Sequence, residues 1–175
     1  TRNHILIEGY LPGREYCVAV CGPVVARGGR LQRLDGPLTF AFIERVLERD
    51  EKIFTSMDVK PIDGSRLRLL EPEADAAVIA ELDRLGRDVF TELSLETLVR
   101  LDVRADRHGR LHVLEANPKP DLKAPTATVT SIVGEGLGRV GMTYDDLILS
   151  LLADRIDVLF TQGRGTADGL LALIR

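Results

Sequence analysis

The chain has 175 residues, of which 45% are hydrophobic and 29% are charged, and its formal net charge is −4. This composition is typical of a soluble globular protein with one core, and the length favours one or two domains. Basic residues are interspersed among acidic ones, which argues against a nucleic-acid partner. No apolar run approaches the length of a membrane span, and no charged-then-apolar signal segment opens the sequence, so we expect no membrane association.

The first residues already have the pattern of a strand, over 4–8, although the chain starts at Thr1 without a methionine. We therefore expect a piece of a longer protein. A turn-rich connection, 9–13, leads into a longer strand over 14–21. Both faces of that strand are apolar, which predicts a central, covered position in a sheet.

Two cysteines, Cys17 and Cys21, lie four residues apart in that predicted strand. At a rise of about 3.3 Å per residue they would be about 13 Å apart, too far for a disulfide. No histidine lies nearby to complete a metal site. We expect buried free thiols, which is consistent with a cytoplasmic location.

The next segments alternate between predicted strands and irregular structure. Residues 23–26 are predicted to pair with the long strand or to continue it, and Gly28–Arg30 breaks the run. Another strand is predicted over 38–43. Residues 44–68 mix charges of both signs without a sustained period, so we interpret them as a surface loop with some short structure.

A clear helix is predicted to start near Pro72, a residue suited to the first turn. Its apolar stripe recurs at helical spacing and is expected to cover the sheet. The stripe consists of Ile79, Leu82, Gly86, Phe90 and Leu93.

Two further helices are predicted in the last third of the chain. A weaker one runs from about 128 to 140 and is closed by Gly141. A long one begins at Thr143, whose hydroxyl can cap it. Residues 163–175 are interpreted as a short terminal helix or a flexible tail. The buried face of the long helix is predicted to contain Tyr144, Leu147, Ile148, Leu151, Leu152 and Leu159.

Between these helices, residues 98–120 have the pattern of two strands joined by a tight turn at 106–109. If Ala105 pairs with Arg110, then Arg100 lies opposite Glu115 and Asp102 lies opposite Val113. Side chains two residues apart share a face of a strand. One face is therefore predicted to carry Arg100, Asp102, Glu115 and Asn117, and the core-facing side Val99, Leu101, Val103, Leu114 and Ala116.

The predicted polar face gathers two carboxylates, an amide oxygen and a guanidinium over a sheet, while His112 is expected to point away from it. Such a cluster is costly unless it is neutralised, and a hard cation with oxygen ligands that bridges to a phosphate would do so. A solvated outer face of the sheet is the simpler alternative. The rigid loop with two prolines over 118–123 favours a binding site, because active-site loops are commonly attached at the end of such a strand.

A second pattern surrounds the first turn of the chain. Glu8 and Glu15 flank Pro12-Gly13, where a carboxylate can accept hydrogen bonds from ribose hydroxyls and free backbone groups can read an adenine edge. Two exposed glutamates beside a turn are the alternative. The chain contains no strand–GxxxxGK–helix loop and no GxGxxG motif that opens a helix.

Together these patterns resemble the C-terminal part of an ATP-grasp ligase, closest to the D-alanine–D-alanine ligase group. The matching stretches are LIEGYLPGREYCVAV at 6–20, VRLDV at 99–103, LEANP at 114–118 and GMTYDDLI at 141–148. The resemblance implies an α+β fold, with a largely antiparallel sheet and helices packed on one face. It also implies that 1–175 form a single ATP/Mg-binding domain.

The resemblance implies a role for each matching residue. Glu8 falls at the adenine hinge, Leu11 in the nucleotide site and Glu15 at the ribose. Arg100 falls at the residue that steadies the transferred phosphoryl group. The implied cofactors are ATP and Mg²⁺, with Mn²⁺ as an alternative, and the implied metal ligands are Asp102, Glu115 and Asn117. A lysine over the phosphates corresponds to Lys52 or Lys60.

The implied function is an ATP- and Mg²⁺-dependent carboxylate–amine ligase that acts through an acylphosphate on an amino-acid or peptide substrate. This chain would be its nucleotide- and metal-binding part, inactive alone because the N-terminal domains of the same protein are missing from it. In that family a glycine near the oxyanion is expected where Asp121 stands. The alternatives are therefore a non-catalytic nucleotide-binding or regulatory module, or a structural domain. A homodimer is left open.

Overall fold

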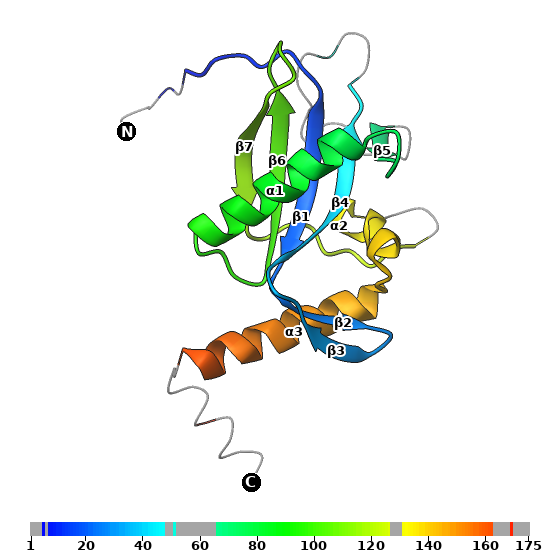
Figure 1. Ribbon diagram of the computed structural model, residues 1–175, viewed down its shortest axis with the longest axis vertical. Coiled ribbons are helices and arrows are strands. Elements are labelled where there is room, and N and C mark those ends of the chain that lie inside the picture. Colours follow the sequence, from blue (N-terminus) through cyan, green and yellow to red (C-terminus); the bar gives the residue numbers. More distant parts are fainter. Residues whose placement is uncertain are drawn as a thin grey trace.

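The computed structural model describes residues 5, 7–47, 51, 66–126, 131–162 and 169. Its centre is a five-stranded sheet in the order β5-β4-β1-β6-β7, in which every neighbouring pair is antiparallel (Figure 1). The strands are β1 (Glu15–Cys21), β4 (Leu38–Arg45), β5 (Leu67–Leu69), β6 (Leu98–Ala105) and β7 (Leu111–Asn117). The predicted antiparallel sheet is confirmed.

Strand β1 lies in the middle of this sheet with both faces buried, as its sequence predicted. Tyr16, Val18 and Val20 face one core, whereas Cys17 and Cys21 face the other. Both cysteines are free and buried. Burial raises the pKa of each thiol, that of Cys21 to about 12, so neither is a reactive thiolate.

Helix α1 (Ala76–Glu92) covers one face of the sheet. Leu82, Gly86 and Phe90 are its buried residues, which confirms most of the predicted stripe. A Cβ atom at Gly86 would lie 3.0 Å from Cγ2 of Thr39, so the glycine allows the helix to approach the sheet closely. Leu93 lies beyond the end of the helix and is exposed, so its inclusion in the stripe was wrong.

Two short helices pack against β4 on the opposite face, α2 (Ile132–Glu135) and η2 (Leu137–Val140). The last turn is closed by Gly141 in the left-handed conformation, with φ of 68°. The helix predicted over 128–140 is thus two shorter ones, and residues 127–130 lie outside the described part of the chain.

The segment after β1 forms a separate hairpin. Strand β2 (Val24–Arg27) pairs with β3 (Arg30–Arg33) in a two-stranded sheet, and the turn between them has positive φ at Gly28 and Gly29. The prediction that residues 23–26 pair with or continue the long strand was therefore wrong. Of the segment 44–68, the structure describes residues 44–47, 51 and 66–68, which include the end of β4 and the start of β5.

Helix α3 (Tyr144–Thr161) begins as predicted. Thr143 and Asp146 form a capping box in which each side chain accepts a hydrogen bond from the other's backbone N–H. None of the described helices is both long enough and apolar enough to cross a membrane.

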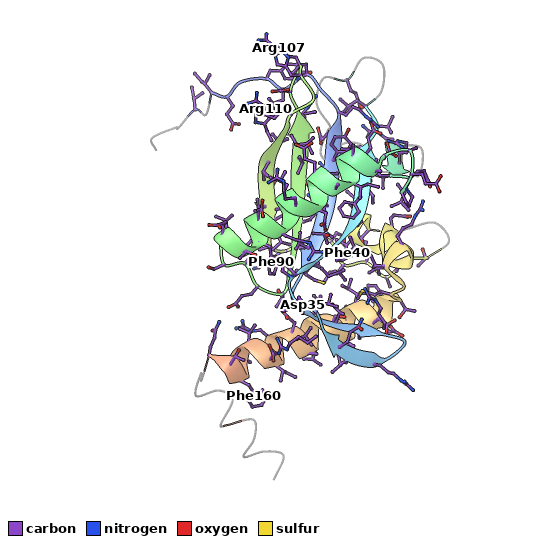
Figure 2. All side chains as sticks on the ribbon, viewed as in Figure 1. Asp35, Phe40, Phe90, Arg107, Arg110 and Phe160 are labelled. Atoms are coloured by element: carbon purple, nitrogen blue, oxygen red, sulfur yellow. The ribbon has the colours of Figure 1, made fainter. Side chains whose placement is uncertain are left out.

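The buried side of α3 differs from the prediction. Asp146, Ser150 and Asp154 accept hydrogen bonds from three backbone N–H groups of the β2–β3 hairpin, at N–O distances of 2.8, 2.7 and 3.4 Å. Leu147 is buried as predicted, but Ile148 and Leu152 are exposed. Figure 2 shows Phe160 on the side of α3 that faces away from the five-stranded sheet.

The opening strand predicted over 4–8 is not formed by its described residues, 5, 7 and 8. In Figure 1 the part of this segment that the structure describes extends away from the sheet. Ile7 is 89% exposed. A strand needs a partner for its backbone groups, and these residues have no ladder partner within the described part of the chain.

Candidate functional site

The hairpin of β6 and β7 brings the predicted polar residues together on one face, but in a different register. Asp102 lies directly opposite Glu115, and Arg100 lies opposite Asn117. The predicted pairs, Arg100 with Glu115 and Asp102 with Val113, were therefore wrong by two residues. Because the shift is even, the four side chains still share a face.

The turn explains part of this difference. Asp106 closes a longer loop, since its Oδ1 accepts hydrogen bonds from the backbone N–H groups of His108 and Arg110 at 2.7 and 3.0 Å. Ala105 consequently pairs with Leu111 instead of Arg110. Arg110 lies at the hairpin tip in Figure 2.

A β-bulge between Asp102 and Val103 accounts for the rest. The bulge inserts Leu114 as an unpaired residue, and this side chain is 53% exposed. Beyond the bulge, His112 pairs with Arg104 and thus lies on the polar face. The predictions that Leu114 faces the core and that His112 faces away from the carboxylates were both wrong.

The polar face contains a buried network of ion pairs that spans three strands. Glu15 on β1 and Asp102 on β6 are only 4% and 7% exposed. Arg100 holds Asp102 with two hydrogen bonds, of 2.8 Å to Oδ1 and 2.9 Å to Oδ2. Arg104 reaches Glu15 at 3.3 Å. Two carboxylates are thus stabilised in a buried position by guanidinium groups.

Arg45, the last residue of β4, is the member of the network that the sequence predictions missed. Its Nη1 lies 3.0 Å from Oε1 of Glu15, and its Nη2 lies 3.1 Å from Oδ2 of Asp102. The buried carboxylates raise the pKa of Arg45 against the opposing effect of burial. Arg104 could have been found, because it lies two residues from Asp102 on the same strand. Arg45 gave no such signal.

Glu115 and Asn117, the other two predicted metal ligands, lie on the edge strand β7. The Glu115 carboxylate is exposed and makes no hydrogen bond or ion pair within the described part of the chain. The Asn117 Oδ1 accepts a hydrogen bond from the backbone N–H of Lys119 at 2.9 Å, which holds the amide at the start of the following loop.

The residues near the N-terminus that are predicted to bind the nucleotide are more dispersed than those of the polar face. Glu8 is exposed in the extended segment, and no contact joins it to Glu15 within the described residues. Leu11 is half-buried. Tyr10 lies over the guanidinium of Arg104, with 5.3 Å between the guanidinium carbon and the ring centroid. This contact attaches the connection before β1 to β6.

In the loop after β7, the Asp121 carboxylate is held by Lys123 of the same loop. Asp121 Oδ1 accepts a hydrogen bond from the backbone N–H of Lys123 at 3.1 Å, and its Oδ2 lies 3.2 Å from the Lys123 Nζ. Tyr144 of α3 donates a hydrogen bond to the Leu122 carbonyl at 2.6 Å. Lys52 and Lys60, predicted to cover the phosphates, lie outside the described residues.

The carboxylate and amide oxygens on this face are the kind of ligand that a hard divalent cation prefers. No group of three or more His, Cys, Asp or Glu residues in the described chain is arranged around a metal position. Magnesium here would depend on two carboxylates, one amide and oxygens from a bound phosphate. Such a shared arrangement is usual for magnesium in phosphoryl-transfer sites.

An antiparallel sheet with a long helix on one face and a charged patch on part of the other is the architecture expected for the C-terminal part of an ATP-grasp ligase. The family model described as "D-ala D-ala ligase C-terminus" matches residues 1–153. The chain therefore belongs to this family, and the predicted resemblance is confirmed.

Curated relatives support the assignment. The chain is 31% identical over 154 residues to a D-alanine–D-alanine ligase of Gloeobacter violaceus, a match that covers 87% of this chain and 44% of that protein. It is 28% identical over 162 residues to the Caulobacter sp. (strain K31) ligase, covering 92% of this chain and 45% of that one. The chain thus spans less than half the length of these relatives.

Solved structures share the fold. The Coxiella burnetii D-alanine–D-alanine ligase superposes with a TM-score of 0.61 at 16% identity, covering 96% of this chain and 39% of that protein. The Bacillus anthracis ligase complexed with ATP gives 0.56 at 14% identity, covering 86% and 39%. At these identities the likeness concerns the fold alone.

Proposed function

We propose that the protein containing this chain is an ATP-dependent ligase that joins a carboxylate to an amine, and that the chain supplies its nucleotide- and metal-binding part. The observation that carries the proposal is the polar face of β6 and β7, which occurs in a chain of this family. Arg100, Asp102, Glu115 and Asn117 share that face. The ATP complex of the Bacillus anthracis relative is consistent with it.

Each residue receives a role from its position. Glu15 would accept hydrogen bonds from the ribose hydroxyls, with Glu8 and Leu11 on the adenine side. Asp102, Glu115 and Asn117 would hold Mg²⁺, or Mn²⁺, against the phosphates. Bound there, the metal would neutralise charge on the β- and γ-oxygens.

Arg100 is the proposed catalytic residue, because its guanidinium lies on the same face as the metal ligands and can approach a transferred phosphoryl group. It is now paired with Asp102. A cation at Asp102 would compete for the same oxygens and release part of the guanidinium toward phosphate. In the proposed reaction a substrate carboxylate attacks the γ-phosphorus and displaces ADP, which gives an acylphosphate. An amine then attacks the acyl carbon and displaces phosphate, with loss of a proton from the nitrogen, to form the amide.

The substrate is proposed to be an amino acid or a short peptide, and the domains that select it belong to the rest of the protein. Asp121 stands where a glycine would serve a developing oxyanion. Because Lys123 pairs with this acid, its charge is partly offset. We propose a cytoplasmic location, which agrees with the two free thiols.

The test uses the intact protein with ATP, Mg²⁺ and a panel of D- and L-amino acids. A ligase releases phosphate only when a suitable substrate pair is present, and the amide product appears in equal amount. A protein that binds ATP but releases no phosphate with any pair would instead be a nucleotide-binding module.

The site assignment is tested with Glu115→Gln. Loss of this carboxylate should weaken Mg²⁺-dependent ATP binding by about tenfold or more, because one anionic metal ligand is lost. Glu92→Gln on α1, also an exposed glutamate, is the matched control. Equal binding by both variants would show that Glu115 is not a metal ligand. Global unfolding of Glu115→Gln would show a structural role.

A further inference from the structure

The guanidinium of Arg45 joins two parts of the polar face that lie on different strands. The Arg45 side chain extends from β4 across β1 to Asp102 on β6. Strands β4 and β6 are two strand spacings apart, or about 10 Å. On the way the side chain contacts Glu15 on β1. The proposed ribose ligand and the proposed metal ligand are therefore held by one side chain.

The fork shape of arginine is what makes this double contact possible. Nη1 faces Glu15, whereas Nη2 faces Asp102, at 3.0 and 3.1 Å. A rigid planar guanidinium holds both carboxylates in fixed directions, which a single ammonium group does less well. The Arg45 side chain is only 10% exposed, so water competes little for these contacts.

Other described side chains also contact each carboxylate. Arg104 contacts the second oxygen of Glu15, and Arg100 contacts both oxygens of Asp102. Cys17 on β1, which lies opposite Asp102, donates a hydrogen bond from its thiol to Asp102 Oδ1 at 3.4 Å. Arg45 thus contacts both acids, one with each terminal nitrogen.

Resting on the proposed function, we propose that Arg45 is a positioning residue that couples the nucleotide site to the metal site. By fixing Glu15 relative to Asp102, it sets the distance between the ribose ligand and the metal ligands. Nucleotide bound at one end then finds the metal ligands already oriented at the other. The expected consequence is a favourable coupling between ATP and Mg²⁺ binding that depends on Arg45.

The experiment measures this coupling by calorimetric titration of the intact protein with AMP-PNP, a non-hydrolysable ATP analogue. The Kd is determined with MgCl₂ and with EDTA, and the ratio of the two is the coupling. Wild type, Arg45→Met and Arg45→Lys are compared. Arg45→Met should lower the ratio by about tenfold, within the usual range of coupling between sites. Arg45→Lys should restore part of it, because it retains the charge but not the fork.

Arg68→Met is the matched control, because it removes another two-acid guanidinium from the opposite face of the sheet. Arg68 lies 2.7 Å from Glu44 and 2.7 Å from Asp75, and Glu44 adjoins Arg45 on β4. A change that reflects only lost ion pairs would lower the unfolding temperature in both variants and leave the coupling ratio unchanged in both.

The outcomes separate the two proposals. If wild type binds no AMP-PNP under either condition, the proposed function fails. If wild type binds and Arg45→Met keeps its ratio, or loses no more than Arg68→Met, the role of Arg45 is overturned while the proposed function stands. Tighter Mg²⁺-dependent binding by Arg45→Met would also overturn it, since the guanidinium would then only repel the metal. If Arg45→Met does not fold, a wild-type ratio in Arg45→Lys serves as the overturning result and a lowered one as support.

Discussion

The two long helices contact the rest of the protein through different kinds of side chain. Helix α1 buries Leu82, Gly86 and Phe90 against the apolar face of the sheet. Helix α3 also buries Leu147, but it turns Asp146 and Ser150 inward as well, toward backbone N–H groups of the β2–β3 hairpin. An exposed strand edge offers unpaired N–H donors, and side chains at i, i+4 and i+8 of a helix can satisfy them. A helix can therefore pack by its polar face when its neighbour is a strand edge.

The largest effect is expected for Leu82→Ala on α1. Leu82 is fully buried, so the substitution should lower the free energy of unfolding by about 2–5 kcal/mol through lost apolar contact and a residual cavity. Urea unfolding followed by circular dichroism measures it. A loss below about 1 kcal/mol would mean that α1 does not depend on this contact.

On α3, Ser150→Ala should cost about 1–3 kcal/mol, because the backbone N–H of Ala26 would be left buried without its acceptor. The same urea experiment measures the loss. Thr161→Ala serves as a control, since that hydroxyl bonds only to carbonyls of its own helix near the exposed end. Equal losses in both variants would contradict the polar attachment of α3.

The attachment of α3, unlike that of α1, should depend on pH. Backbone N–H groups of Thr143 and Gly29 lower the pKa of Asp146 to about 2. A lowered folded-state pKa gives stability that is present above the unfolded pKa of about 3.9 and is lost as the pH falls toward 2. Asp146→Asn should therefore lower the unfolding temperature near neutral pH, and the difference should vanish near pH 2.

Two comparisons sharpen that measurement. The destabilisation by Leu82→Ala should change little over the same pH range, because no titrating group is removed. For Asp154 the pH dependence of stability should have the opposite sign. Burial raises the pKa of this carboxyl, so the stability that it contributes is lost as the pH rises. A pH-independent effect of Asp146→Asn would show that its charge is not what binds the hairpin.

The smallest effect is expected for Leu152→Gln on the outer side of α3. Leu152 is 59% exposed, so the free energy of unfolding should change by no more than about 0.5 kcal/mol. Thermal unfolding of the intact protein tests this. A much larger loss would show that another part of the protein covers this side of the helix.

Local signals in the sequence were sufficient for much of the fold and for part of the site. Alternation across two apolar faces located β1, the spacing of Leu82 and Phe90 located α1, and the Thr143 cap located the start of α3. The two-residue period also placed Arg100, Asp102, Glu115 and Asn117 on one face, because an error of two residues in register leaves the face unchanged.

What the sequence by itself determined is therefore β1, α1, the start of α3 and the polar face of the hairpin, because these follow from periods and caps within a few residues. Only the tertiary structure decided which strand edge α3 contacts, where the bulge turns His112, and that Arg45 reaches both Glu15 and Asp102. The contacts of α3 and of Arg45 join residues 30 to 130 positions apart in sequence, and the bulge depends on how β7 pairs with β6, so no local pattern encodes these features.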